Sequence, residues 1–559
     1  MGLGDDDFLA FMRHHHLRGR DVAMQNYEYS WLIVWAIVGI LIVRLGVGYW
    51  ASKKVETTTD YVLAGRRLPI WMAAPSIMAT WFAAETLMGS SSEAYKYGLQ
   101  GVIFDPFGAT LCLVLSGLLI VRLARRAQYV TIMDFFQQRY GTAMSVVGSV
   151  AQIIGYFGWT AAQIVAGGAI LKALLGWDLA AGMVLVAGVV TIYTMAGGLW
   201  ADTALDFMQM FLTMGGLLII FGGILWAVGG LDAFIGMAGA QYTDYPFAMA
   251  PTAEEGYLGY QGTLGWFYYA AAWMAIGLGS IPAQDYLQRT CAARNENVAV
   301  KSTYIAAFLY ITFGVLSPFI GMAAYTAIGP EIVADETQFI LITMAMKYLN
   351  PILVALFVAA LASALMSTSD SSMLAGATMF TENIVKVFKP DLSDKTQLFL
   401  TRAALVVSGV LSLVIALWAQ SIYELAVLAN TCILVGMVAP YVIGMYWKKA
   451  NHIGALVSFF SGSISWIFLS IYYYYAPEFG TFAICEGDLY CSLWDAVYIG
   501  SAPAFLISVV AFIVASLATG KIDPPKILKD IYGKPVSMKN ALGWSNLNEE
   551  PAADTTSGD

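Results

Sequence analysis

The stretch LASALMSTSDSSM, from Leu361 to Met373, places six hydroxyl side chains and one carboxylate within a segment that is otherwise largely apolar. In a helix, residues spaced by three, four and seven positions share one face. This spacing brings together Ala364, Ser367, Thr368 and Ser371. The oxygen atoms on this face suit a desolvated alkali cation, and the carboxylate of Asp370 favours a functional site because its burial is costly. The alternative is a stripe of small residues that lets two helices pack closely.

The composition is typical of a membrane protein. Hydrophobic residues make up 59% of the 559 residues, charged residues make up 12%, and the mean hydropathy is +0.67. Because about a quarter of the residues of a soluble domain are charged, we expect a polytopic protein in a lipid bilayer. The net charge of −9 comes without a basic stripe or an RNA-binding motif, which argues against a nucleic-acid partner.

Apolar segments of about 20 residues are long enough to cross a bilayer as helices. The sequence contains about thirteen of them and predicts an all-α polytopic membrane protein. Its parts are a polar extracellular N-terminus over residues 1–28, a transmembrane transporter domain over 29–519 and a cytoplasmic tail over 520–559. The predicted helices cover residues 29–50, 69–93, 101–123, 143–172, 179–198, 204–228, 262–288, 303–328, 351–385, 398–420, 422–447, 453–475 and 494–519.

The basic residues predict the orientation. Most Lys and Arg side chains fall on one side of the thirteen-helix arrangement, among them Lys53, Arg125, Arg289 and the lysines between residues 521 and 539. By the positive-inside rule, this places the N-terminus outside and the C-terminal tail in the cytoplasm. We expect a multi-pass protein of the plasma membrane, or of the inner membrane in a bacterium.

Two cysteines, Cys485 and Cys491, fall in a predicted external loop. An oxidising exterior permits a disulfide between them. Two free thiols are the alternative with equal weight, because spacing in the sequence does not fix the geometry that a disulfide needs.

Two predicted helices are interrupted. The second contains Pro69 and Pro75 and carries Glu85 inside its apolar span, whereas the seventh contains Gly279 and Pro282. Each is followed by four more helices. Interrupted helices at corresponding positions of two halves indicate inverted repeats with a binding site at the membrane midplane. We therefore expect a five-plus-five core with repeats over about 69–228 and 262–447.

Several separated motifs resemble the sodium:solute symporter family, in the order that this family shows. They are YVLAGRRLP at 61–69, GGL at 197–199 with Asp206 and Gln209, and LMSTSDSS at 365–372. Further motifs are most similar to the high-affinity choline transporter branch: ATW at 79–81, YVTIMDFFQQRYG at 129–141, IPAQDYLQR at 281–289 and MFTENI at 379–384. The resemblance runs from about Trp31 to Trp447 and implies a sodium-driven importer with a five-plus-five core.

The resemblance implies where sodium binds. The family's common site matches Ala79, Phe82, Ala364, Ser367 and Thr368. A second sodium site, present in some members, matches Asp206, Ser367, Asp370 and Ser371. Because Asp206 and Asp370 are far from any expected Lys or Arg partner, we expect a cation between them. The alternative role for Asp206 is that of an N-cap or of a charge at the end of a helix. Sodium is the only expected cofactor, with no transition metal and no organic group.

The resemblance also implies a substrate site. The matching positions are Trp81, Glu85, Asp105, Trp159, Ala283 and Gln284. Trp81 and Trp159 match two walls of the aromatic cage that holds trimethylammonium in the choline branch, and ring faces attract desolvated cations. Ala283 stands where that branch has a tryptophan. Anchoring at the membrane interface is the alternative role for the two tryptophans.

We therefore expect a sodium-coupled symporter that imports a small cationic or zwitterionic substituted amine, similar to choline, by alternating access. The alternatives are symport of a sugar, amino acid or carboxylate, or a transporter-like sensor. An enzyme is not expected, because His occurs only at positions 14, 15, 16 and 452 and no catalytic motif is present. The expected partners are the substrate, sodium ions and the bilayer, while the oligomeric state is open.

Overall fold

The computed structural model describes residues 29–240, 245–329, 334–419, 421–475 and 493–537, together with residues 540, 542, 544 and 545. Over these residues the chain is helical, and its β pairing is limited to isolated bridges. This confirms the all-α fold. The expectations for residues 1–28 and for Cys485 and Cys491 lie outside the described residues.

The helices follow the predicted segments closely. The first half contains α2 (Ser30–Ser52), α3 (Thr58–Leu63), α4 (Ile70–Ala79), α5 (Ser90–Tyr97), α6 (Ala109–Leu119), α7 (Val121–Ala127), α8 (Ile132–Arg139), α9 (Thr142–Leu175), α10 (Leu179–Val228) and α11 (Leu231–Ala238). The second half contains α12 (Gly262–Gly277), α13 (Gln284–Ala292), α14 (Glu296–Gly314), α15 (Leu316–Ile328), α16 (Ile340–Tyr348), α17 (Pro351–Met379), α18 (Lys386–Phe388), α19 (Asp394–Trp418), α20 (Ile422–Val438), α21 (Gly444–Tyr446), α22 (His452–Tyr475) and α23 (Leu493–Thr519).

Ten helices in the described part of the chain are long and apolar enough to cross a membrane. The predicted count of thirteen is not confirmed. The other three predicted segments are 69–93, 179–198 and 262–288. In two of them, 69–93 and 262–288, helix breaks leave pieces that are shorter than the roughly 20 residues a bilayer requires. The third, 179–198, ends at a bend in α10.

Both predicted helix interruptions are present. The first separates α4 from a π-helical turn at Glu85–Gly89 that leads into α5, and the second separates α12 from α13. The breaks pack against each other, because the ring centroids of Trp81 in the first and Tyr286 just after the second lie 5.5 Å apart. Backbone without helical hydrogen bonds is therefore placed in the protein interior, where it can line a site.

A third bend occurs in α10 at Gly198, where φ is +57°. A Cβ atom at this position would lie 2.5 Å from the ring of Tyr61, so both the backbone conformation and the packing require glycine. The bend separates the predicted segments 179–198 and 204–228.

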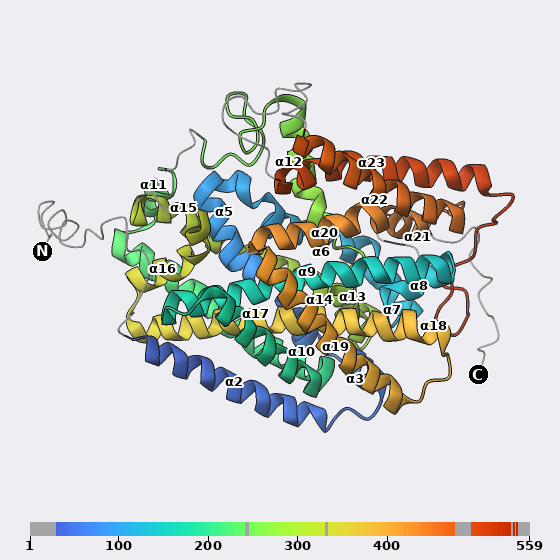
Figure 1. Cartoon of the computed structure of the whole chain (residues 1–559), viewed down its shortest axis with the longest axis horizontal. Helices are drawn as coiled ribbons and strands as arrows, with labels where there is room; N and C mark the ends of the chain where they lie inside the picture. Colours follow the sequence, from blue (N-terminus) through green and yellow to red (C-terminus); the bar gives the residue numbers. More distant parts are fainter. Residues whose placement is uncertain are drawn as a thin grey trace, which may run out of the picture.

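In Figure 1, α17 crosses the molecule with α2 along one side of it, and α22 and α23 lie at the opposite edge. Contacts confirm that α17 packs against α2, α9 and α10. The buried hydroxyl-rich segment of α17 thus lies among these helices. By contrast α2 is peripheral, with Trp35 and Ile42 exposing 67% and 64% of their surfaces, as suits a lipid-facing helix.

Candidate functional site

The predicted sodium ligands gather where α17 passes the end of α4. The hydroxyl of Thr368 donates a hydrogen bond of 3.3 Å to the carbonyl oxygen of Ala79, the last residue of α4. Ser367 is fully buried beside it and donates to Asp206 Oδ1. Ala79 and Phe82 line one small cavity of about 10 Å³ with Gln209. The structure therefore brings carbonyl and hydroxyl oxygens together, although sodium binding there stays a prediction.

Arg289 contacts the predicted second sodium site. Its Nη2 atom lies 3.4 Å from Asp206 Oδ2 and 2.5 Å from Asp202 Oδ2, and it donates to the hydroxyl of Ser371. Asp206 also accepts a hydrogen bond of 2.5 Å from Ser76. The expectation that Asp206 lacks a basic partner is wrong, because the fold brings Arg289 on α13 to Asp202 and Asp206 on α10.

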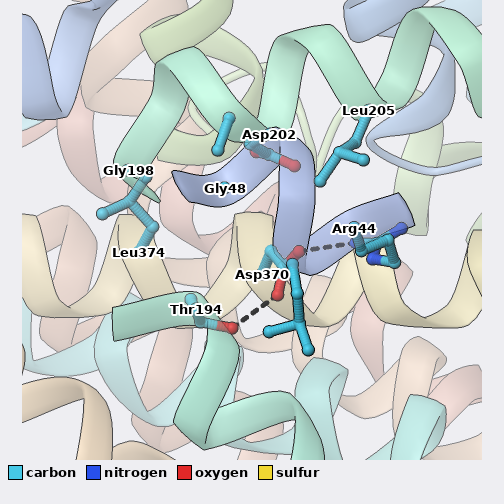
Figure 2. Close-up of a pocket in the computed structure, with 10 residues that line it drawn as sticks. Arg44, Gly48, Thr194, Gly198, Asp202, Leu205, Asp370 and Leu374 are labelled. Atoms are coloured by element: carbon cyan, nitrogen blue, oxygen red, sulfur yellow. Dashed lines mark hydrogen bonds and ion pairs between the residues drawn. The ribbon is translucent and has the colours of Figure 1, made fainter. Parts of the chain in front are cut away.

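Asp370 also has a basic partner, from a helix that the sequence analysis did not include in the site. Arg44 Nη2 on α2 lies 2.8 Å from Asp370 Oδ2, and Thr194 on α10 donates to Asp370 Oδ1 (Figure 2). The expected isolation of Asp370 is therefore also wrong. A signal was present in the sequence, because an arginine inside the apolar span 29–50 is costly without a partner.

Trp81 belongs to a buried polar cluster between the two breaks. Its Nε1 atom donates a hydrogen bond of 2.9 Å to Asp285 Oδ2 at the start of α13. Tyr156 on α9 donates to the other oxygen, Asp285 Oδ1, at 2.9 Å. Asp285 and Tyr156 are not among the site residues expected from the sequence, although Asp285 directly follows the predicted Gln284.

Glu85 and Asp105 are fully buried close to this cluster. Gln163 donates to Glu85 Oε2 at 2.8 Å and accepts from the backbone N–H of Ala84 at 3.2 Å, whereas Glu85 Oε1 has no hydrogen-bond partner. Asp105 Oδ2 accepts from Thr86 at 3.0 Å and from Tyr310 at 2.9 Å. The buried carboxylates thus have neutral donors, and one oxygen of Glu85 is left without a hydrogen bond.

The other predicted substrate residues divide into two groups. Trp159 lies between Tyr156 and Gln163 on one face of α9, is 5% exposed, and has no hydrogen-bond partner at Nε1. Ala283 is buried and precedes α13 directly. Gln284 differs, because its amide bonds to the backbone N–H of Ile132 at 2.7 Å and to the carbonyl of Val130. These bonds hold its side chain at the start of α8 instead of in the Trp81 cluster.

Two interrupted helices that meet beside a row of hydroxyls on a third helix are typical of ion-coupled membrane transporters. The model of the Sodium:solute symporter family matches residues 61–462. The chain belongs to that family, which confirms the resemblance seen in the sequence motifs.

Curated relatives include transporters of two kinds. The chain is 27% identical over 459 residues to High-affinity choline transporter 1 of Caenorhabditis elegans, covering 77% of this chain and 76% of the relative. It is 26% identical to the Homo sapiens protein of that name, and the match covers 76% of this chain and 75% of the relative. It is 25% identical to the Sodium/pantothenate symporter of Escherichia coli (strain K12), and the match covers 78% of this chain and 90% of the relative.

A solved structure shares the fold. It is the substrate-bound outward-open state of a Na+-coupled sialic acid symporter, with a TM-score of 0.72 and 20% sequence identity. The match covers 91% of this chain and 99% of the solved chain. The family match over residues 61–462 identifies the protein as a sodium:solute symporter, and its apolar helices are long enough to span a membrane.

Proposed function

We propose that the imported solute is a small amine that carries a positive charge, either as a cation or as a zwitterion. The observation that carries the proposal is the group of three fully or almost fully buried carboxylates, Glu85, Asp105 and Asp285, around the buried ring of Trp81. A buried carboxylate that is ionised is stabilised by a positive partner. In the described part of the chain, none of the three forms an ion pair with Lys or Arg.

The aromatic rings support the same class of substrate. Trp81, Tyr156 and Tyr286 lie at the junction of the two breaks, and ring faces attract desolvated cations. Choline transporters among the relatives agree with this chemistry. Pantothenate symporters are also relatives, but an anionic substrate would meet repulsion from the carboxylates at this site.

Two further assignments are part of the proposal. Ala79, Phe82, Ala364, Ser367 and Thr368 hold the coupling sodium. The C-terminal segment lies in the cytoplasm, because it packs on the arginine-rich side of the molecule. There, Tyr129 donates to the carbonyl of Lys529 and Arg126 donates to that of Ser537.

Uptake by purified protein in proteoliposomes tests the substrate class. An inward sodium gradient should drive accumulation of labelled amines, and unlabelled amines should compete while sugars and simple carboxylates should not. If only sugars or carboxylates drive or inhibit sodium-dependent uptake, the amine proposal is wrong and the family assignment stands.

Replacement of Trp81 by Leu separates the classes further. If a desolvated cation contacts the ring, the change should cost about 1 to 2 kcal/mol of substrate binding beyond lost packing. The matched control is Trp226→Leu, because Trp226 lies on α10 and is 88% exposed. Equal effects of the two variants on amine affinity would contradict a role for the Trp81 ring.

A further inference from the structure

We propose that Arg44 is a tethered counter-ion of Asp370, so that α2 supplies the positive charge that a second sodium ion would otherwise bring to α17. One sodium ion, at the site of Ser367 and Thr368, then remains to couple transport. The proposal rests on that sodium site and concerns the number of ions, not the identity of the solute.

The contacts of Arg44 fit a permanent pairing. Its Nη2 atom lies 2.8 Å from Asp370 Oδ2, while its Nη1 atom donates to the carbonyl and the hydroxyl oxygens of Ser363 at 3.2 and 3.3 Å. The guanidinium therefore holds two points on α17 that are about two helical turns apart. The side chains of Arg44 and Asp370 are 2% and 7% exposed. A planar guanidinium suits such a buried, multiply bonded position better than a mobile ammonium group.

Both oxygens of Asp370 already accept from donors in this arrangement. Oδ2 accepts from Arg44, and Oδ1 accepts from Thr194, as Figure 2 shows. A sodium ion needs oxygen lone pairs that point toward it. The guanidinium and the Thr194 hydroxyl direct hydrogen atoms toward the carboxylate oxygens. These donors occupy the lone pairs that a sodium ion would need.

The carboxylates on this side of α17 already have guanidinium partners. Asp370 pairs with Arg44, and Asp202 and Asp206 pair with Arg289. Ser367, a proposed ligand of the coupling sodium, donates to Asp206 and not to Asp370. A sodium ion beside Ser367 therefore adds its charge next to Asp206, while Asp370 has Arg44 as its counter-ion.

The counter-ion comes from outside the matched part of the chain. Arg44 precedes residues 61–462, which the family model matches, and α2 precedes both predicted repeats. The same helix exposes large apolar side chains such as Trp35. The pairing with Asp370 therefore fastens a lipid-facing helix to the helix that carries the sodium ligands.

The test counts sodium ions bound by the purified full-length protein in the absence of substrate. Sodium-dependent thermal stabilisation is measured at constant ionic strength, with potassium as the replacement ion. The parent and Arg44→Lys should both show a Hill coefficient near one. Arg44→Gln frees Asp370 for a cation, and the Hill coefficient should rise toward two.

The double variant Arg44→Gln with Asp370→Asn removes both charges and avoids the unpaired buried charge that can prevent folding of either single variant. Its Hill coefficient should stay near one, and its sodium half-saturation should stay within about threefold of the parent, which corresponds to less than 0.7 kcal/mol. The matched control is Arg122→Gln, because Arg122 lies at the surface and its ion pair to Glu296 is 3.8 Å long.

A parent Hill coefficient near two that falls to one in the double variant would overturn the proposal, because Asp370 would then be a sodium ligand. A parent that does not distinguish sodium from potassium would overturn the underlying sodium site instead. Failure to find an amine substrate affects neither result, since no substrate is present.

Discussion

The hydroxyls of α17 differ in where they donate, and this difference separates ion ligands from packing groups. Ser369 donates to the carbonyl of Leu365, four residues earlier in the same helix. Such bonds satisfy a buried hydroxyl locally. Ser367 and Thr368 instead donate to groups on α10 and α4. Their oxygens therefore lie between helices, where a cation could bind them.

We predict that Ser367→Ala combined with Thr368→Ala raises the sodium concentration for half-maximal uptake by about tenfold or more, or about 1.4 kcal/mol, because two ligands are lost from a site with few of them. Sodium-dependent uptake in proteoliposomes measures the change. Ser369→Ala is the control, since Ser369 is buried in the same helix but donates within it. An unchanged half-saturation in the double variant would place the sodium site elsewhere.

The Oε1 atom of Glu85, which has no hydrogen-bond partner, leads to a prediction about which amines bind most tightly. Glu85 Oε1 is buried without a partner, and it is satisfied best by a substrate that carries an N–H group. Protonated primary to tertiary amines should thus bind more tightly than their quaternary methylated analogues. The difference should be about 1.5 to 3 kcal/mol, the usual value of a hydrogen bond to a charged group.

Glu85→Gln should remove most of this preference, because the amide replaces the charge. Inhibition constants for pairs of methylated and unmethylated amines provide the measurement, and Glu93→Gln is the control, because Glu93 on α5 is already paired with Lys96. A preference for quaternary amines in the parent would show that Glu85 does not receive an N–H group.

At the scale of elements, the two helix breaks place both sites. Glycine is required inside the second break, because a Cβ atom at Gly279 would lie 2.0 Å from the carbonyl oxygen of Ala275 and 2.7 Å from that of Asn430. Ser280 next to it donates to the side chain of Asn430 on α20. The break is therefore fastened to α20 through close backbone packing, which in turn positions Asp285 opposite Trp81.

We predict that Gly279→Ala destabilises the protein by about 1 to 3 kcal/mol or more, the usual cost of inserting a methyl group into a packed core. Thermal unfolding in detergent should show a lower midpoint and amine transport should be lost. Gly46→Ala on α2 is the control, because a Cβ atom there meets no atom within 4 Å. If the two variants unfold at the same temperature, the break is more adaptable than its packing indicates.

At the scale of the whole molecule, the C-terminal segment is bound to the end of the bundle that carries α7 and α8. Arg139 donates to the carbonyls of Gly444, Lys526 and Trp447, and Ile531 donates its N–H to the carbonyl of Ala127. The same end carries Arg125 and Arg126. This arrangement places a basic surface and the C-terminal segment on one side of the membrane.

We predict that a cysteine introduced at exposed Lys534 reacts with a membrane-impermeant thiol reagent only after the cells are permeabilised. A cysteine at exposed Ala253, in the connection between α11 and α12, should react in intact cells. Both substitutions are made with Cys485 and Cys491 replaced by Ser. The reverse pattern would invert the orientation derived from the positive-inside rule.

The sequence by itself determined the membrane-spanning segments, both helix interruptions and the hydroxyl row on α17. These features depend on local information: the length of apolar runs, the placement of Pro and Gly, and the spacing of side chains along one helix. Trp81, Glu85 and Asp105 were expected as substrate residues from the family resemblance of the sequence motifs. Local information did not establish the count of thirteen spans, since helix breaks divide two of the segments.

Only the tertiary structure decided which charges meet. Arg44 and Asp370 are 326 residues apart, and Trp81 and Asp285 are 204 residues apart. Helical periodicity predicts which side chains share a face but not which helix faces them, so Asp370 was expected to pair with sodium instead of Arg44. Gln284 was assigned to the substrate site from the family resemblance, whereas in the structure its amide accepts a hydrogen bond from the backbone of Ile132 at the start of α8. Burial makes each of these pairings obligatory, because a charge or amide inside the membrane must find a partner among the helices that happen to surround it.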